Sequence, residues 1–275
     1  MDGPTGQGRG PAARDWARAL AEWAIPPEIM ATAERSPWAH PVHRFADRAD
    51  AAVARPGGPS FERARAALAA SPGTVLDVGA GAGAASLPLA PWTSAFTAVD
   101  RVPAMLDAYR ERAAALHRPA AAVEGAWPDV APGVAVHDVV VCHHVVYDVA
   151  DIGPFLRALT GHARRLVVLE LPPRHPLTWM APLWQAVHGV VRPTRPTADD
   201  LVAVLCELGL AGDLVVDRWR RAEEPDVQPL AERAALVAQR LCLPQSREAE
   251  VAALLDGVDR SGLGDVVTLA WPGSP

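Results

Sequence analysis

The chain has 275 residues, of which 50% are hydrophobic, and a formal net charge of −6 at pH 7. This length and hydrophobic share predict one large domain with insertions, and an acidic chain without a basic run argues against nucleic acid as a main partner. Three scattered cysteines, the absence of an apolar run of roughly 18 residues and the absence of signal-peptide features predict a cytoplasmic protein without membrane contact.

The N-terminal part of the chain predicts a tail followed by helices. Residues 1–14 are rich in glycine, proline and polar side chains, and we expect them to be disordered. Asp15 can cap one helix and Ser60 another. We expect residues 15–70 to form a helical cover over a ligand site, with a plain packing arm as the alternative.

The stretch around residue 80 predicts a strand, a glycine loop and a helix. Residues 75–78 are a short apolar run with β-branched members, as in a buried strand. Glycines follow at every second position, at Gly79, Gly81 and Gly83. They permit a tight turn and a close approach of backbone N–H groups to a ligand. Residues 84–90 are expected to start a helix whose amides face that ligand, the nucleotide-binding opening of a doubly wound α/β domain.

Two acidic residues accompany this loop. Asp77 lies inside the apolar strand, where a carboxylate is costly unless something pairs with it. Asp100 ends the next apolar run, 96–100, about twenty residues after the loop, where an acid can bind two ribose hydroxyls.

The run Val-Leu-Asp77-Val-Gly79-Ala-Gly81-Ala-Gly83, followed by Ala-Val-Asp100, resembles the class I methyltransferases that use S-adenosylmethionine. The resemblance covers about residues 70–220 and the last strand. It implies S-adenosylmethionine as the cofactor and a role for Asp77 at its methionine amino end. It also implies the following cofactor-binding residues: Gly79, Ala80, Gly81 and Gly83 in the loop, Asp100 at the ribose with Arg101 beside it, Ala126 and Trp127 near the adenine, and His143.

Two details qualify the resemblance. The family often has an acid at the place of Ala126, so backbone groups and the Trp127 ring would have to replace it. A nicotinamide cofactor is the alternative, because Gly79, Gly81 and Ala84 also satisfy G-x-G-x-x-A. Asp77 would repel a pyrophosphate, whereas S-adenosylmethionine brings an ammonium and a sulfonium.

The remaining chain predicts a Rossmann-like, seven-stranded, mostly parallel sheet with an antiparallel last strand. The later strands are expected at 96–100, 120–124, 138–142, 165–171, 213–219 and 266–271, and the helices between them at 103–116, 151–161 and 198–209. The methyltransferase core would span 71–275, with helical insertions at 172–196 and 221–262.

Candidate catalytic residues follow the fourth strand. His143 and His144 should point to different faces, so we expect one to meet the cofactor or acceptor, where it could act as a base, and the other to pack. Tyr147 could orient an acceptor or pack in the core. His175 flanks the first insertion and could line the pocket. A metal site made by Cys142 and the two histidines is not expected, since consecutive ligands do not fit zinc spacing.

Glu170 ends the fifth strand and leaves two possibilities open. Its carboxylate could bind an amine or hydroxyl of the acceptor, or it could form an ion pair with Arg174 or Arg192.

These observations predict an S-adenosylmethionine-dependent methyltransferase with a small-molecule acceptor and O-methyl transfer. The chain has no asparagine, which excludes the Asn-Pro-Pro-Tyr loop of many amino-group methyltransferases. The pattern Cys-His-His-Val-Val-Tyr147 also resembles a group of actinobacterial methyltransferases of unassigned substrate. The alternatives are a cofactor-binding regulatory or scaffold protein, a protein or RNA methyltransferase, and a nicotinamide-dependent oxidoreductase. The helical segment 228–256 suggests an interface for a homodimer.

Overall fold

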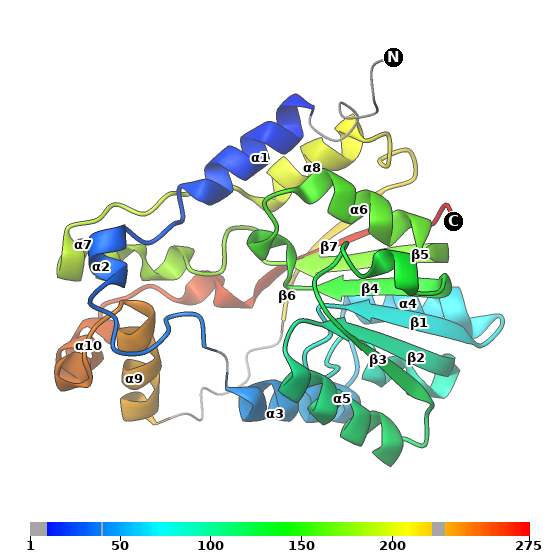
Figure 1. Ribbon diagram of the computed structural model, residues 1–275, viewed down its shortest axis with the longest axis horizontal. Helices are drawn as coiled ribbons and strands as arrows, with labels where there is room; N and C mark the ends of the chain where they lie inside the picture. Colours follow the sequence, from blue (N-terminus) through cyan, green and yellow to red (C-terminus); the bar gives the residue numbers. More distant parts are fainter. Residues whose placement is uncertain (1–9, 40, 222–228) are drawn as a thin grey trace.

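A seven-stranded sheet forms the centre of the computed structural model, which describes residues 10–39, 41–221 and 229–275. The strands are β1 (Gly73–Val78), β2 (Thr93–Asp100), β3 (Ala120–Glu124), β4 (His137–His143), β5 (Ala163–Leu171), β6 (Val215–Arg220) and β7 (Asp265–Pro272). Their order is β3-β2-β1-β4-β5-β7-β6 (Figure 1), and only β7 runs antiparallel to its neighbours. The predicted sheet is confirmed.

Helices cover both faces of the sheet. One face packs against α1 (Pro11–Ala21), α6 (Ile152–Gly161) and α8 (Ala198–Glu207), and the other against α3 (Val42–Ala54), α4 (Pro59–Ala69) and α5 (Pro103–Ala115). Side chains alternate between the faces. Leu76 and Val78 therefore enter the first layer, and Val75 and Asp77 point into the layer of α4 and α5.

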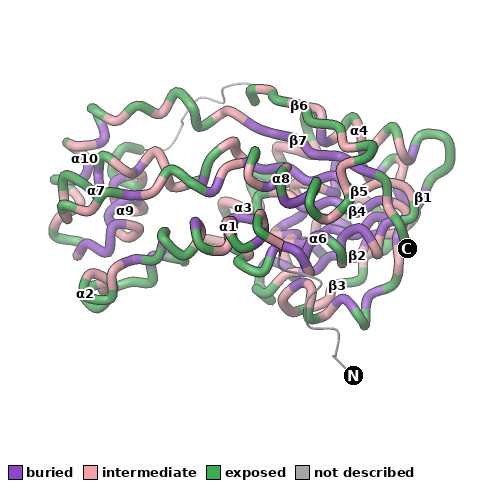
Figure 2. The backbone as a smooth tube through the Cα atoms, turned by 90° about the horizontal axis from the view of Figure 1, so that it is seen from above, coloured by how far each residue is buried: buried purple, intermediate pink, exposed green. Residues whose placement is uncertain are grey.

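A second helical unit lies beyond the carboxyl ends of the parallel strands (Figure 1). It contains α2 (Pro27–Met30), α7 (Ala181–His188), α9 (Leu230–Arg240) and α10 (Glu248–Leu255). These helices bury their own apolar core around Trp184 and Val237, visible as a separate buried region in Figure 2. The unit combines α2 of the predicted N-terminal cover with parts of both insertions, whereas α1, α3 and α4 pack on the sheet. Residues 222–228 of the second insertion lie outside the described part.

Two predictions at the N-terminus were wrong. Helix α1 begins at Pro11 instead of after Asp15, because proline at the first helical position needs no N–H partner. The predicted tail 1–14 is thus too long; residues 1–9 lie outside the described part. Ser60 does not cap α4: Gly58 holds the cap position, and Ser60 is buried as the second residue of the helix.

The segment after the glycine loop also differs from the prediction. Residues 84–86 form turns, and a 3-10 helix, η1 (Leu87–Trp92), replaces the expected α-helix. Pro88 and Pro91 explain this, since each removes a backbone donor that an α-helix needs. Across the described residues, no helix is long and apolar enough to cross a bilayer.

Candidate active site

The glycine loop is held by its own backbone. The amides of Gly79 and Ala80 donate to the Val99 carbonyl at 2.8 and 3.0 Å, and the Gly83 amide donates to the Ala80 carbonyl at 2.9 Å. Gly81 donates to Asp100 Oδ2 at 2.8 Å. The expectation that these amides are available to a ligand therefore needs correction: the loop offers a surface without side chains, and the neighbouring carboxylates offer the polar contacts.

The glycines are required where the chain packs closely. Gly79, Gly81 and Gly83 have φ angles of +72°, +51° and +99°, which side-chain-bearing residues rarely adopt. A Cβ atom on Gly79 would lie 2.2 Å from Val145 Cγ2, so the loop after β4 touches the loop after β1. On Gly81, the nearest atom would be Phe45 Cδ1 of α3, at 3.4 Å. This contact places α3 against the glycine loop, as the predicted helical cover requires.

Asp77 is fully buried below the loop. Its Oδ2 accepts a 2.6 Å hydrogen bond from Ser86 Oγ. Because Ser86 has used its only proton, the Tyr109 hydroxyl, 2.8 Å away, must donate to Ser86. Asp77 Oδ1 is buried and has no partner among the described residues. Burial, helped by the negative charge of Asp100, raises the pKa of Asp77 to about 7, although the Ser86 hydrogen bond opposes this rise.

Asp100 lies half-buried at the end of β2. Its two oxygens accept from the amides of Gly81 at 2.8 Å and Val102 at 2.9 Å. Each carboxylate oxygen has a second lone pair, so both can still accept hydroxyl protons of a ribose. Arg101, the next residue, is exposed.

The two residues expected near the adenine have different environments. Ala126 is half-buried in the turn after β3, whereas Trp127 is buried against the edge of the His162 ring, with ring centres 4.8 Å apart. The Trp127 indole N–H is buried without a partner in the described part of the chain. Their contact with the cofactor stays a prediction.

A second polar cluster lies at the carboxyl ends of β4 and β5. Glu170 is buried, and its Oε1 is 2.5 Å from Arg221 Nη2 and 3.1 Å from His144 Nε2. Its Oε2 accepts from Ser60 Oγ at 2.5 Å. Burial acts to raise the pKa of Glu170, but the imidazoles of His143 and His144 and the Arg221 guanidinium outweigh it and hold this pKa below its ordinary value. The carboxylate is therefore ionised.

Hydrogen-bond directions in this cluster follow from the donors. The Trp219 indole N–H donates to Thr268 Oγ1 at 3.0 Å. Ser60 donates to Glu170, so the Thr268 hydroxyl, 2.6 Å from Ser60 Oγ, donates to Ser60. The hydrogen bonds therefore run from Trp219 through Thr268 and Ser60 to Glu170, which accepts the last one.

The two histidines differ in access. His143 has a side chain 17% exposed, with Nδ1 3.9 Å from Glu170 Oε1 and Nε2 buried without a described partner. Burial lowers its pKa to about 4, despite Glu170. The His144 side chain is 36% exposed. His144 has a φ of +60°, and its amide donates to the Glu170 carbonyl at 2.7 Å, which fixes its place beside Glu170. Both imidazole rings therefore lie within 4 Å of the same carboxylate oxygen, Glu170 Oε1.

Tyr147 and His175 lie together, away from this carboxylate. The Tyr147 hydroxyl donates to the Pro172 carbonyl at 3.0 Å, and its ring stacks on Trp16 at 5.6 Å between ring centres. His175 stacks on Trp23 at 3.7 Å, and burial lowers its pKa to about 3. Tyr147 thus packs against α1 and Pro172, and His175 against Trp23 after the end of α1. The catalytic role of both residues stays a prediction.

The expected ion pairs of Glu170 are wrong. Arg192 is buried, donates to the carbonyls of Trp23 and Ala24, and lies between the rings of Trp23 and Trp184. Arg174 forms a backbone bridge with Thr197. Arg221, Ser60 and Thr268 were missed, although a threonine inside the apolar run of β7 was a detectable signal.

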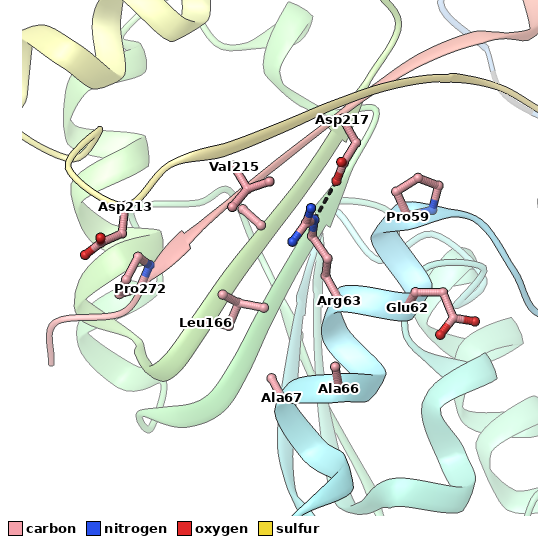
Figure 3. A pocket seen from close by; sticks show the side chains of 11 residues that line it. Pro59, Glu62, Arg63, Ala66, Ala67, Leu166, Asp213, Val215, Asp217 and Pro272 are labelled. Carbon is pink, nitrogen blue, oxygen red and sulfur yellow. Dashed lines mark hydrogen bonds and ion pairs between the residues drawn. The ribbon is translucent and has the colours of Figure 1, made fainter.

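A surface groove of about 570 Å³ lies elsewhere, between α4 and the strands β5, β7 and β6 (Figure 3). The Arg63–Asp217 ion pair, 2.5 Å long, crosses it. It shares no lining residue with the glycine loop or the Glu170 cluster.

The residues around the glycine loop fit S-adenosylmethionine. Asp77 Oδ1, a buried carboxylate oxygen without a described partner, suits an ammonium group, and the side-chain-free loop leaves room for the cofactor. Together with the sheet order and the antiparallel β7, this site defines a class I methyltransferase.

Comparisons with known proteins agree. Residues 75–166 match the family model of the methyltransferase domain. A ubiquinone biosynthesis O-methyltransferase from Caulobacter vibrioides is 27% identical over 248 residues, in an alignment covering 77% of this chain and 95% of that protein. Residues 75–166 therefore form a methyltransferase domain, and S-adenosylmethionine is the cofactor that the residues around the glycine loop fit.

Solved structures share the fold. The plantazolicin methyltransferase BamL, in complex with a triazolic desmethylPZN analog and SAH, has a TM-score of 0.54 at 10% identity, covering 95% of this chain and 98% of that chain. The magnesium protoporphyrin IX methyltransferase ChlM from Synechocystis PCC 6803, with bound SAH, has a TM-score of 0.50 at 15% identity, covering 95% and 97%.

Proposed function

We propose that this methyltransferase methylates a hydroxyl oxygen of a small molecule, with His144 as the proton acceptor. The observation that carries the proposal is the 3.1 Å contact between His144 Nε2 and Glu170 Oε1. It lies at the carboxyl ends of β4 and β5, where doubly wound sheets bind their ligands. The oxygen acceptor is also supported by the similarity to an O-methyltransferase at 27% identity.

The contact with Glu170 determines which His144 nitrogen can take a proton. Nε2 is 3.1 Å from the ionised Glu170 and 3.5 Å from Arg221 Nη2. The shorter contact, to a full negative charge, favours a proton on Nε2. The neutral ring then carries its lone pair on Nδ1, which can accept the proton of a hydroxyl. His143 is a weaker candidate, since burial disfavours its protonated form.

The chain's other residues bind and orient. S-adenosylmethionine supplies a methyl carbon on a positively charged sulfur that is already a good leaving group. Asp77 would hold its ammonium, and Asp100 its ribose hydroxyls. The remaining task is alignment in a site shielded from water, to which Phe45 of α3 contributes by covering Gly81.

A small acceptor is supported by what surrounds this edge of the sheet. The unit of α2, α7, α9 and α10 lies beyond it (Figure 1), and Phe45 of α3 lies next to Gly81 of the loop. Helices placed over the ligand-binding edge favour a small molecule, whereas a protein or RNA needs an open groove. The cytoplasmic location and the homodimer stay predictions.

The test measures S-adenosylhomocysteine formation with the small-molecule, protein and RNA fractions of an actinobacterial extract. We expect turnover with small molecules, and a loss of about 10²-fold or more in kcat for His144→Gln, the usual contribution of a general base. The loss should shrink at high pH, where the acceptor ionises by itself. His143→Gln is the matched control, with a smaller loss. Turnover only with protein or RNA contradicts the proposal, as does cofactor binding without any turnover, which indicates a regulatory protein.

A further inference from the structure

Arg221 brings a positive charge to the proposed acceptor site. Arg221 follows β6, and its side chain is 45% exposed although one guanidinium nitrogen contacts the buried Glu170. Nη2 is the atom that contacts Glu170 and lies near His144 Nε2. A guanidinium has five donors in a planar fork, so Arg221 can bind a second anion on its exposed side.

Glu170 does not require the whole Arg221 side chain. The buried carboxylate already accepts from Ser60 and contacts His144. A buried ion pair alone would favour an enclosed guanidinium, since water weakens the attraction. Arg221 instead lies half in the open, flanked by the Trp219 ring at 5.7 Å and the His144 ring.

We infer that the acceptor is an organic acid whose carboxylate binds Arg221 while its reacting hydroxyl faces His144. This inference rests on the proposed function and names its substrate class. The hydroxyl oxygen forms the new bond to the methyl carbon, the bond from that carbon to sulfur breaks, and the hydroxyl proton passes to His144 Nδ1. Because Arg221 and His144 are adjacent, the carboxylate and the hydroxyl lie close together, as in a 2-hydroxybenzoate.

The first experiment separates an actinobacterial metabolite extract on an anion exchanger. Each fraction is incubated with S-adenosylmethionine carrying a tritiated methyl group. We expect at least tenfold more labelled product in the acidic fraction than in the neutral one. Label mainly in the neutral fraction overturns the inference and leaves the proposed function intact. Label in neither fraction, although calorimetry shows cofactor binding, overturns the proposed function and the inference with it.

The second experiment separates recognition by Arg221 from its support of Glu170. With the labelled acceptor identified, Arg221→Gln should raise KM for the acid at least tenfold and leave KM for its neutral methyl ester unchanged. Arg220→Gln is the matched control, because Arg220 pairs with Asp265 on the adjacent strand. Equal changes in KM for acid and ester, or a fall in kcat alone, would mean that Arg221 only supports Glu170.

Discussion

Asp77 and Ser86 are nine residues apart, and their side chains meet below the glycine loop at 2.6 Å. The hydroxyl satisfies one oxygen of a fully buried carboxylate and leaves the other without a described partner. The protein therefore keeps, inside its core, a carboxyl oxygen that is open to a ligand, and we predict that the ammonium group of the cofactor binds there.

Asp77→Asn should stabilise the free protein and weaken cofactor binding. The pKa of Asp77 is raised from 3.8 to about 7, so the native state holds its proton more tightly than the unfolded chain. Stability consequently falls as pH rises from about 4 to 7, by about 4 kcal/mol at about 1.4 kcal/mol per pKa unit. Thermal unfolding at pH 8 should show a higher Tm for the variant. Calorimetry should show S-adenosylmethionine affinity lower by about 1–3 kcal/mol. An unchanged affinity would place the ammonium elsewhere.

Ser86→Ala and Tyr109→Phe should weaken binding of S-adenosylhomocysteine, because they remove the donors that orient Asp77. Affinity for 5′-methylthioadenosine, which lacks the amino-acid end, should not change. Calorimetry with both ligands measures the difference. Equal losses for both ligands would point to general disruption of the loop.

Gly79→Ala should be far more harmful than Gly81→Ala. Both glycines have positive φ, but only the Cβ on Gly79 collides, 2.2 Å from Val145 Cγ2. The additional substitution Val145→Ala should recover part of the lost Tm in the Gly79 variant and none in the Gly81 variant. If it recovers neither, backbone strain alone explains the requirement for glycine.

Glu170→Gln should unfold more readily at neutral pH. The pKa of Glu170 lies below its ordinary value of 4.5, so its ionised form contributes stability that is present above that value and lost as pH falls. The difference in unfolding free energy between wild type and variant should therefore shrink toward acid pH in urea titrations. A difference independent of pH would show that shape, and not charge, is what matters at this position.

Tyr147→Phe should lower stability by about 1 kcal/mol, the usual contribution of one hydrogen bond, because the hydroxyl donates to the Pro172 carbonyl. Methyl transfer should stay within threefold of wild type. A hundredfold loss in kcat with unchanged Tm would instead give Tyr147 a role at the acceptor.

The sequence alone predicted the sheet, which the structure confirms, and the residues proposed to bind the cofactor. Local sequence patterns are enough to predict the strands, the glycine loop, Asp77 and Asp100. Each strand shows as a short apolar run, and the loop shows as closely spaced glycines that can adopt positive φ angles. Helix α5 buries four side chains that recur at helical spacing: Met105, Leu106, Tyr109 and Ala113.

The tertiary structure decided the acceptor half. Glu170 meets Arg221, not Arg174 or Arg192, because β5 and β6 run in the same direction on either side of β7 and end at the same edge of the sheet. Strand register sets Glu170 between His143 and Thr268, and α4 brings Ser60 above them. These partners are up to 110 residues from Glu170 in the sequence. Such contacts depend on strand order and helix packing, which local sequence patterns do not encode.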